Sequence, residues 1–273
     1  MQVFVLSDNT AGAPNFLAEH GLSLLVRTAD GDMLMDVGQG IAAMHNAELL
    51  RASLDGLQGV ILSHGHYDHT AGLPQLLMKK APAKVYAHPW IFDAKYYRIG
   101  DSKRFIGIPW RSEYLETLGA DFELESSPRE LLPGMTLTGE IPRVTDFEPG
   151  DPNLVVDRGG DLFPDPFLDD QALVIDYPQG LVVILGCAHA GIINTITYAR
   201  QITGKSRIRA AIGGSHLAFL SPEQLERTIE ELKLMEPELL AFSHCTGQVA
   251  ARRLSQEFGD GFVFNQTGTV INI

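Results

Sequence analysis

The sequence predicts an α/β fold in which helices cover layered, mixed β-sheets. The N-terminal part is dominated by strand-like runs and a hairpin, whereas the second half alternates short apolar runs with runs of helical periodicity. No internal repeat, low-complexity segment or linker is evident in the 273 residues. We therefore expect one domain spanning residues 1–273.

The N-terminal half alternates predicted strands with short helices. Residues 21–38 are predicted to form a hairpin, because two apolar runs meet at the Asp-Gly turn signal in "ADGD". Residues 89–111 are aromatic and basic and show no clear period. The other predicted elements are strands at 1–8, 59–64, 83–88 and 135–141 and helices at 41–53, 72–80 and 113–119.

The second half begins with a segment of different composition. Residues 142–170 are rich in Pro, Gly and Asp and are predicted to form a long loop, a kind of segment that is often functional. Ser221 and Gln224 have the spacing of a capping box at the start of a helix. The predicted elements are a hairpin at 171–189, helices at 191–203, 221–235 and 247–258, and strands at 208–216 and 238–244.

Composition argues against several classes of function. The formal net charge of −13 argues against non-specific binding to nucleic acid or to an anionic membrane. Two cysteines, Cys187 and Cys245, do not make a disulfide framework. The N-terminus lacks secretory-signal character, and no window approaches the roughly 20 apolar residues of a membrane span. We expect a cytoplasmic protein that binds neither nucleic acid nor membrane.

Histidines gather at the ends of predicted strands. Ligands of layered α/β folds bind beyond the carboxyl ends of strands, so histidines repeated at such ends indicate a shared site. One histidine at a strand end is most often a packing residue, but four strand ends with the same residue type are hard to explain by packing. The six histidines at these ends are His64, His66, His69, His189, His216 and His244.

The segment 63–73, "SHGHYDHTAGL", carries the densest group of ligand-type side chains. Alternation along an extended chain puts His64 and His66 on one side, where both can reach one ion. Asp68 and His69 follow in the turn and can bend toward a second ion. Imidazole with carboxylate suits zinc, iron(II) or manganese. We predict one or two divalent metal ions per chain, zinc before iron or manganese.

The run "HGHYDH" resembles the H-x-H-x-D-H signature of the metallo-β-lactamase superfamily. The segments "MLMDVG", "LGCAHAGIINT", "IGGSHL" and "HCTG" extend the similarity over nearly the whole chain. Together they resemble the branch named for 7,8-dihydropterin-6-methyl-4-(β-D-ribofuranosyl)aminobenzene-5′-phosphate synthase. The resemblance implies an αββα sandwich, with two mixed sheets flanked by helices and a metal site at their edge.

The resemblance also implies a ligand set. His64 and His66 match ligands of a first ion. Asp36 matches an aspartate that supports the site from behind the ligands. The ligands that it implies for a second ion are Asp68, His69 and His244.

Two ligands of the resembled family have no direct counterpart here. The family has a further histidine and an aspartate that bridges both ions. His189 can replace one of them, and Cys187 and Glu140 are candidates for the other. Without a bridging carboxylate the second ion is expected to bind more weakly, and a mononuclear site is the alternative.

Several residues are expected to serve substrate and proton transfer. Asp68 would orient the nucleophile, and His216 would act as a general acid or base or contact the substrate, with a supporting or strand-end role as its alternative. For His20 and His88 a structural role is expected before the alternative, an approach to the site, and His45 is expected to lie on the surface. Residues 89–111 are either a solvated loop or a lid that binds an anionic, ring-bearing substrate. The basic residues that suggest such a lid are Arg98, Lys103, Arg104 and Arg111, and the first three are expected to bind the substrate.

These features predict a metal-dependent hydrolase or transferase that acts on a small phosphorylated compound, pterin-like if the branch name applies. It would use a metal-bound hydroxide or metal-assisted departure of pyrophosphate. One alternative is a lactonase or thioesterase on the same scaffold, with an apolar pocket and no role for the arginines. The other is an iron-binding redox or sensor protein. Two cysteines and the lack of a flavin or rubredoxin-like domain count against it.

Overall fold

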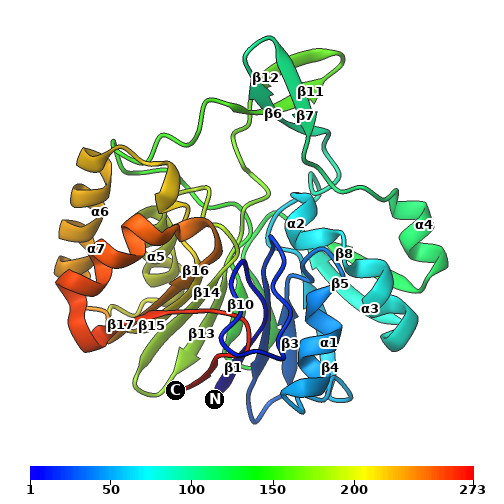
Figure 1. The fold of residues 1–273 in the computed structure, drawn as a ribbon, viewed down its shortest axis with the longest axis horizontal. Helices are drawn as coiled ribbons and strands as arrows, with labels where there is room; N and C mark the ends of the chain where they lie inside the picture. Colours follow the sequence, from blue (N-terminus) through cyan, green and yellow to red (C-terminus); the bar gives the residue numbers. More distant parts are fainter.

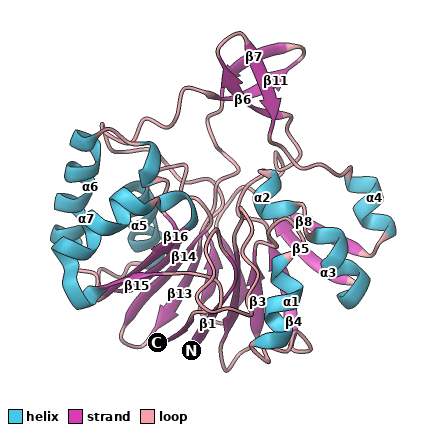
Figure 2. Ribbon diagram, in the orientation of Figure 1, coloured by secondary structure: helices cyan, strands magenta, loops and turns pink.

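A computed structural model describes residues 1–273 and shows two seven-stranded sheets stacked face to face. Helices cover the outer face of each sheet (Figure 1). Colouring by secondary structure makes the order of layers plain: helices, sheet, sheet, helices (Figure 2). The αββα sandwich implied by the sequence is therefore confirmed.

The first sheet is built mainly by the N-terminal half. Its strand order is β18-β1-β2-β3-β4-β5-β8, antiparallel from β18 to β3 and parallel from β3 to β8. The predicted hairpin is present as β2 and β3. The strands are β1 (Gln2–Ser7), β2 (Ser23–Arg27), β3 (Asp32–Met35), β4 (Leu57–Ile61), β5 (Ala83–Ala87), β8 (Ala120–Leu124) and β18 (Val270–Asn272), and the helices are α1 (Ala42–Leu49), α2 (Tyr67–Thr70), α3 (Leu73–Lys80) and α4 (Ser112–Thr117).

The second sheet is built by the C-terminal half. Its order is β17-β16-β15-β14-β13-β10-β9, and β14, β15, β16 and β17 run parallel. Its strands are β9 (Arg129–Leu132), β10 (Met135–Leu137), β13 (Leu173–Tyr177), β14 (Gly180–Leu185), β15 (Ile208–Gly214), β16 (Leu239–Ser243) and β17 (Phe262–Phe264). The helices are α5 (Ile192–Thr203), α6 (Pro222–Met235) and α7 (Gln248–Phe258), with short 3-10 turns η1 (Leu217–Phe219), η2 (His244–Thr246) and η3 (Gly259–Gly261). The capping box of Ser221 and Gln224 at the start of α6 is confirmed.

Three apolar clusters hold the layers together. The cluster between the sheets joins side chains of both, among them Val5 and Ile61 from the first sheet and Val182 and Ile212 from the second. A second cluster lies between the first sheet and α1, α3 and α4, and a third between the second sheet and α5, α6 and α7. Because central strands are covered on both faces, they read as continuous apolar runs in the sequence.

A small third sheet stands apart from the sandwich. It has the order β12-β11-β6-β7 and rises above the sandwich in Figure 1. Its strands are β6 (Lys95–Ile99), β7 (Ser102–Phe105), β11 (Leu154–Arg158) and β12 (Asp161–Pro164). The prediction that residues 142–170 form only a loop is therefore wrong. The structure pairs this segment with residues 95–105, which also showed no clear period in the sequence.

None of the seven α-helices has both the length and the apolar character needed to cross a bilayer.

Candidate metal centre

The residues predicted to bind metal meet at one edge of the sandwich, beyond the C-terminal ends of four strands. His64 follows β4, His189 follows β14, His216 follows β15 and His244 follows β16. Three residues in these connections adopt left-handed backbone conformations although they are not glycine: Ala188 (φ 56°), His216 (φ 51°) and His244 (φ 55°). Such conformations are costly and cluster at functional sites.

Glycines let the strand ends approach one another closely. A Cβ atom at Gly186 would lie 2.1 Å from Ser63 Oγ, and one at Gly214 would lie 2.4 Å from the carbonyl oxygen of Gly186. Neither position has room for a side chain. The close approach of the two sheets therefore excludes a side chain at Gly186, and the close approach of the ends of β14 and β15 excludes one at Gly214.

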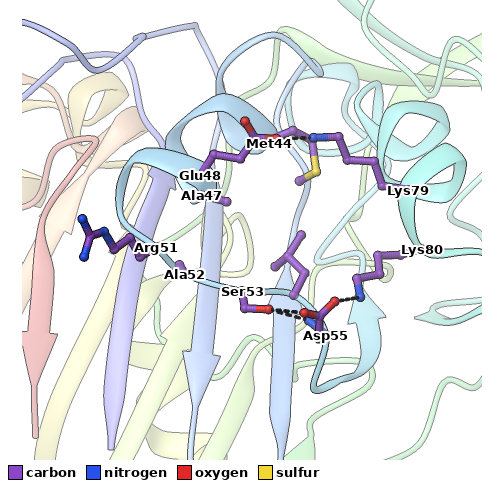
Figure 3. Close-up of a pocket in the computed structure, with 10 residues that line it drawn as sticks. Met44, Ala47, Glu48, Arg51, Ala52, Ser53, Asp55, Lys79 and Lys80 are labelled. Atoms are coloured by element: carbon purple, nitrogen blue, oxygen red, sulfur yellow. Dashed lines mark hydrogen bonds and ion pairs between the residues drawn. The ribbon is translucent and has the colours of Figure 1, made fainter.

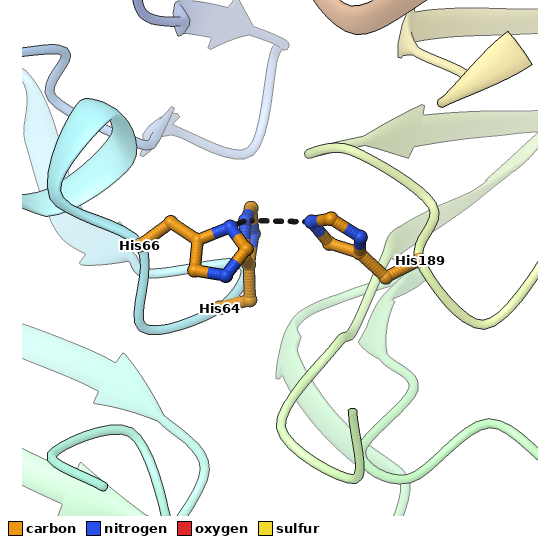
Figure 4. A group of neighbouring side chains, drawn as sticks. All are labelled: His64, His66 and His189. Carbon is orange, nitrogen blue, oxygen red and sulfur yellow. Dashed lines mark hydrogen bonds between the residues drawn. The ribbon is translucent and has the colours of Figure 1, made fainter. Parts of the chain in front are cut away.

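His64, His66 and His189 form the first group of candidate ligands. Their rings point toward one another (Figure 4). His64 Nε2 lies 3.0 Å from His66 Nδ1 and 3.2 Å from His189 Nε2. Two nitrogens that are each about 2.0–2.1 Å from a tetrahedral zinc ion lie roughly 3.3 Å apart. The three nitrogens thus have the spacing of ligands around a single ion.

Asp68, His69 and His244 form the second group of candidate ligands. His244 Nε2 lies 3.2 Å from His69 Nε2 and 3.4 Å from Asp68 Oδ2. His20 joins this group, because its Nε2 atom lies 3.2 Å from the same Asp68 oxygen. The sequence had favoured a structural role for His20, and its position beside Asp68 was not predicted.

Buried acceptors orient the ligating rings of the second group. Asp36 Oδ2 lies 2.7 Å from His69 Nδ1, which leaves Nε2 free to bind an ion. Asn9 Oδ1 lies 2.9 Å from His244 Nδ1, and Asp8 accepts the His244 backbone N–H at 2.8 Å. Asp8 and Asn9 were missed, although both follow the end of β1, where the same strand-end rule could have indicated them.

The two candidates for the missing bridging ligand lie in different places. Cys187 is buried, and its Sγ atom lies 3.2 Å from His69 Nε2. Glu140 lies 3.2 Å from His88 Nε2 and forms no hydrogen bond with a predicted metal ligand. The structure therefore brings Cys187, and not Glu140, into the histidine cluster. His45 lies exposed on α1, as predicted.

The electrostatics of the metal-free cluster suit a cation. Burial holds the pKa of His64, His66 and His189 well below its usual range, so these rings are neutral, as ligands must be. Burial also opposes charge on His69, but Asp36 and Asp68 outweigh it and raise its pKa to about 9. A proton on His69 thus holds positive charge where an ion would bind. The donor set fits divalent metal.

Asp68 stays ionised although it is buried. Burial alone would raise the pKa of its carboxyl group. The charge of His69 and the hydrogen bonds with His20 and His244 overcome burial and hold the pKa well below its usual range. The carboxylate is therefore available as an anionic ligand at neutral pH.

A cavity of about 430 Å³ opens over the two ligand groups, and Arg104 and Tyr97 line it together with His66, Asp68 and His216. The Arg104 guanidinium group lies 3.2 Å from the Tyr67 hydroxyl and 5.4 Å from the centre of the Tyr67 ring. Of the predicted lid residues, Arg104 therefore reaches the cavity above the ligands.

Arg98 and Lys103 lie on the opposite face of the small sheet. Arg104 pairs with Tyr97, whereas Lys103 pairs with Arg98, and neighbouring positions of a strand point to opposite faces. The Lys103 ammonium group lies 3.6 Å from Asp157 and 4.2 Å from the centre of the Tyr96 ring. Neither Arg98 nor Lys103 lines the cavity, so the alternation of the hairpin separates the predicted basic residues.

A buried ion network ties the small sheet to the metal loop. The Lys95 ammonium group lies 2.7 Å from Asp165 and 2.8 Å from Asp169, with all three side chains almost fully buried. Asp169 also accepts the backbone N–H of Gly65, between His64 and His66, at 2.8 Å. The sequence did not indicate Lys95, because a solvated loop and a substrate-binding lid, the two predictions for residues 89–111, both lack a buried lysine.

The molecule also has a depression of about 510 Å³ on its outer helical layer, between α1 and α3 (Figure 3). Its charged groups are largely paired: Glu48 with Lys79 at 2.6 Å and Asp55 with Lys80 at 2.7 Å. No histidine or cysteine lines it. It offers no group for the chemistry described above.

Comparison with known proteins places this geometry in a family. A sequence model described as "Metallo-beta-lactamase superfamily" matches residues 18–244. The uncharacterized protein MJ0448 of Methanocaldococcus jannaschii is 32% identical over 270 residues, which are 98% of this chain and 99% of that protein. Another protein of that organism, named 7,8-dihydropterin-6-methyl-4-(beta-D-ribofuranosyl)-aminobenzene-5′-phosphate synthase, is 28% identical and covers 99% of this chain and 96% of its own.

Solved structures agree with the sequence comparisons. Tm1679, described as a metal-dependent hydrolase of the beta-lactamase superfamily, has a TM-score of 0.83 and 29% identity, over 100% of this chain and 99% of its own. Zn(2+)-bound PqqB from Methylobacterium extorquens shares the fold, with a TM-score of 0.55 and 14% identity over the full length of both chains. The chain therefore belongs to the metallo-β-lactamase superfamily.

Proposed function

We propose that the protein is a metal-dependent hydrolase or transferase that acts on a small phosphorylated compound. The observation that carries this proposal is the position of Arg104, which lines the same cavity as His66, Asp68 and His244. An anionic group held by the guanidinium would place the rest of a small molecule against the two ligand groups. The name of the pterin-pathway relative is in keeping with such a substrate.

The cavity wall also suits a flat ring. Tyr97 and Phe219 line the cavity and present aromatic surface on which a pterin-like group could stack. A second hollow of about 460 Å³ shares Tyr97, His216 and Phe219 with the first and extends toward the start of α5. There Glu148 already accepts the N–H groups of Ile193 and Asn194, so this helix end does not offer a second anion site.

When bound, divalent ions would lower the pKa of water and polarise the oxygen of the bond under attack. Asp68 would accept a hydrogen bond from the nucleophile. His216 would move a proton, since both of its ring nitrogens are buried without a partner beside the cavity. Arg104 would bind the anionic group and fix the direction of the leaving group.

A lactonase or thioesterase on the same scaffold is the second candidate. Half of the cavity lining is apolar and includes Ile99, Ile106 and Leu154, which would suit an uncharged acyl chain. That reading gives Arg104 no part in binding. The two candidates therefore differ in what they predict for one substitution.

The test compares Arg104→Ala with Lys103→Ala, a matched loss of one cation from the opposite face of the same hairpin. Metal content of the natively purified protein is measured first. Phosphorylated and uncharged esters are then assayed with each variant. We expect Arg104→Ala to raise KM for the phosphorylated substrate by roughly tenfold to a hundredfold, since hydrogen bonds to charged groups contribute about 1.5–3 kcal/mol. An equal rise in KM for both substrate classes would contradict the phosphate-binding role of Arg104, and no change for either class would favour the second candidate.

A further inference from the structure

Cys187 lies between the two ligand groups. Its Sγ atom is 3.2 Å from His69 Nε2 in the second group, and it lies within 4.8 Å of a ring nitrogen of His64, a member of the first group. The same distance holds for His189 and for His244. A sulfur and a nitrogen bound to one tetrahedral zinc ion lie roughly 3.6 Å apart. The sulfur is therefore placed to reach an ion in either group.

No carboxylate occupies this position. Asp68 is grouped with His20 and His244, and no group of neighbouring ligand atoms that contains Cys187 includes a carboxylate. Both Asp36 oxygens are engaged, with the Ser63 N–H and hydroxyl and with His69. Two divalent ions in this centre would otherwise face each other across neutral imidazoles. An anionic ligand between them would offset their repulsion, which is strong at short distance in a buried site.

We propose that the Cys187 thiolate is a ligand shared by both ions, in the position that the bridging carboxylate has in the resembled family. The inference rests on the metal-dependent function proposed above. On binding, the Cys187 thiol loses its proton to solvent, and two sulfur lone pairs form one bond to each ion. Thiolate is a soft ligand that suits zinc and iron better than calcium or magnesium, so the centre should select soft over hard divalent ions.

Cys245 provides the matched control. It is buried close to Cys187, with its Sγ atom 3.6 Å from the Cys187 carbonyl oxygen. Its sulfur accepts the backbone N–H of His216 at 3.2 Å and is grouped with His244 but with no ligand of the first ion. A shared ligand must touch both ions, so Cys245 should not replace Cys187.

Cobalt(II) titration of the metal-free protein tests the proposal. Thiolate bound to cobalt(II) gives a near-ultraviolet charge-transfer band that imidazole and carboxylate ligands alone do not give. We expect about two ions per chain, and a band that grows through the first equivalent and changes again with the second. The band should persist in Cys245→Ser. It should vanish in Cys187→Ser, which should also lose about one ion per chain.

Cys187→Asp sharpens the test, because a carboxylate can bridge without giving the band. This variant should regain the second ion and remain without the charge-transfer absorption. Mass spectrometry of the metal content measures the ions independently of turnover. Circular dichroism shows whether each variant is folded. If Cys187→Ser fails to fold, the native protein and Cys245→Ser still decide, since the chain has only two cysteines.

Several results would overturn the proposal. These are a band that stops changing after one equivalent, a band lost in Cys245→Ser, no band with two ions bound, and fewer than two ions per chain. Activity is read separately. If the native protein hydrolyses phosphorylated esters but does not give the band, the proposed function stands and the shared thiolate ligand is ruled out. If the native protein shows the band but is inactive on every phosphorylated substrate, the shared thiolate ligand stands and the proposed function is ruled out.

Discussion

The Phe167 ring is stacked on the His189 imidazole, with ring centroids 4.1 Å apart and ring planes within 8° of parallel. The same ring meets His66 edge to face at 5.6 Å and carries the Lys95 ammonium group 5.0 Å from its centre. Phe167 thus lies between the base of the small sheet and two residues proposed to bind the first ion, His66 and His189. Its packing fixes the orientation of both imidazoles.

Replacing Phe167 by leucine should weaken binding of the first ion. The stack on His189 is lost, so the ring gains freedom that metal binding must remove, and partners of ligating histidines commonly contribute tenfold to a hundredfold in affinity. We expect a drop of about tenfold in zinc affinity, measured by competition with a chelating dye. Phe163→Leu, the same change at an exposed position of β12, is the control. Equal affinities in the two variants would contradict the orienting role.

Replacing Lys95 by methionine should destabilise the fold strongly. Asp165 and Asp169 would be left as buried carboxylates without their cation, which costs about 3–5 kcal/mol. Lys103→Met removes a partly exposed ammonium group beside Asp157 and should cost less than about 1 kcal/mol. Denaturant unfolding of both variants measures the difference. Similar midpoints would show that the Lys95 network adds nothing.

The same network should make stability fall at alkaline pH. Burial disfavours the charged amine, but Asp169 and Asp165 outweigh it and raise the pKa of Lys95 above its usual value. A raised pKa means that the folded chain holds this proton more tightly than the unfolded chain. Its contribution is therefore complete below about pH 10 and is lost as the pH rises further. Unfolding free energies over that range should decline in the native protein and less steeply in Lys95→Met.

His216 should matter for turnover and not for metal content. His216→Ala is expected to keep its ions and to lower kcat by roughly 10²–10⁴-fold, the usual range for a general acid or base. Because His216 has a left-handed backbone (φ 51°), His216→Asn is a second variant that tolerates this conformation. Loss of metal would instead make His216 a ligand, and unchanged turnover would leave it a structural residue.

The two ligand groups should be separable by substitution. His66→Ala should empty the first position and Asp68→Ala the second, each leaving about one ion per chain and no activity. His45→Ala, at an exposed position of α1, is the control and should change neither. Metal content is measured by mass spectrometry after dialysis. Loss of both ions in both variants would show that neither ion binds without the other.

Much of the centre could be predicted because strand ends are local features. Apolar runs that end in a histidine mark β4, β14, β15 and β16, and the C-terminal ends of these strands meet at one edge. The positions of His64, His189 and His244 therefore follow from the sequence with little knowledge of long-range pairing. The sequence does not show which of the two cysteine sulfurs lies between the two groups, because that depends on how the two sheets are stacked.

The small sheet could not be predicted for a physical reason. Residues Leu154, Val155 and Val156 pair with Tyr97, Tyr96 and Lys95, some 60 positions earlier in the chain. Nothing local indicates this register. Lys95 and Lys103 look equivalent in the sequence, yet strand pairing buries one with two aspartates and leaves the other partly exposed. The prediction of a loop at residues 142–170 was wrong because the proline and glycine content of this segment is typical of loops, although the segment contains two short strands, β11 and β12.

The candidate ligands of each ion lie far apart in the sequence, so bound metal should also stabilise the fold. His64 and His189 are 125 positions apart, and His69 and His244 are 175 positions apart. An ion held by both members of such a pair closes a loop as a cross-link does, and in the chain-entropy description a cross-link over more than 100 residues corresponds to about 5 kcal/mol. Each ion would also join one sheet to the other. Protein with bound metal should therefore unfold more slowly in denaturant than protein from which the metal has been removed. The supply of metal would then determine how long the chain stays folded as well as whether it is active.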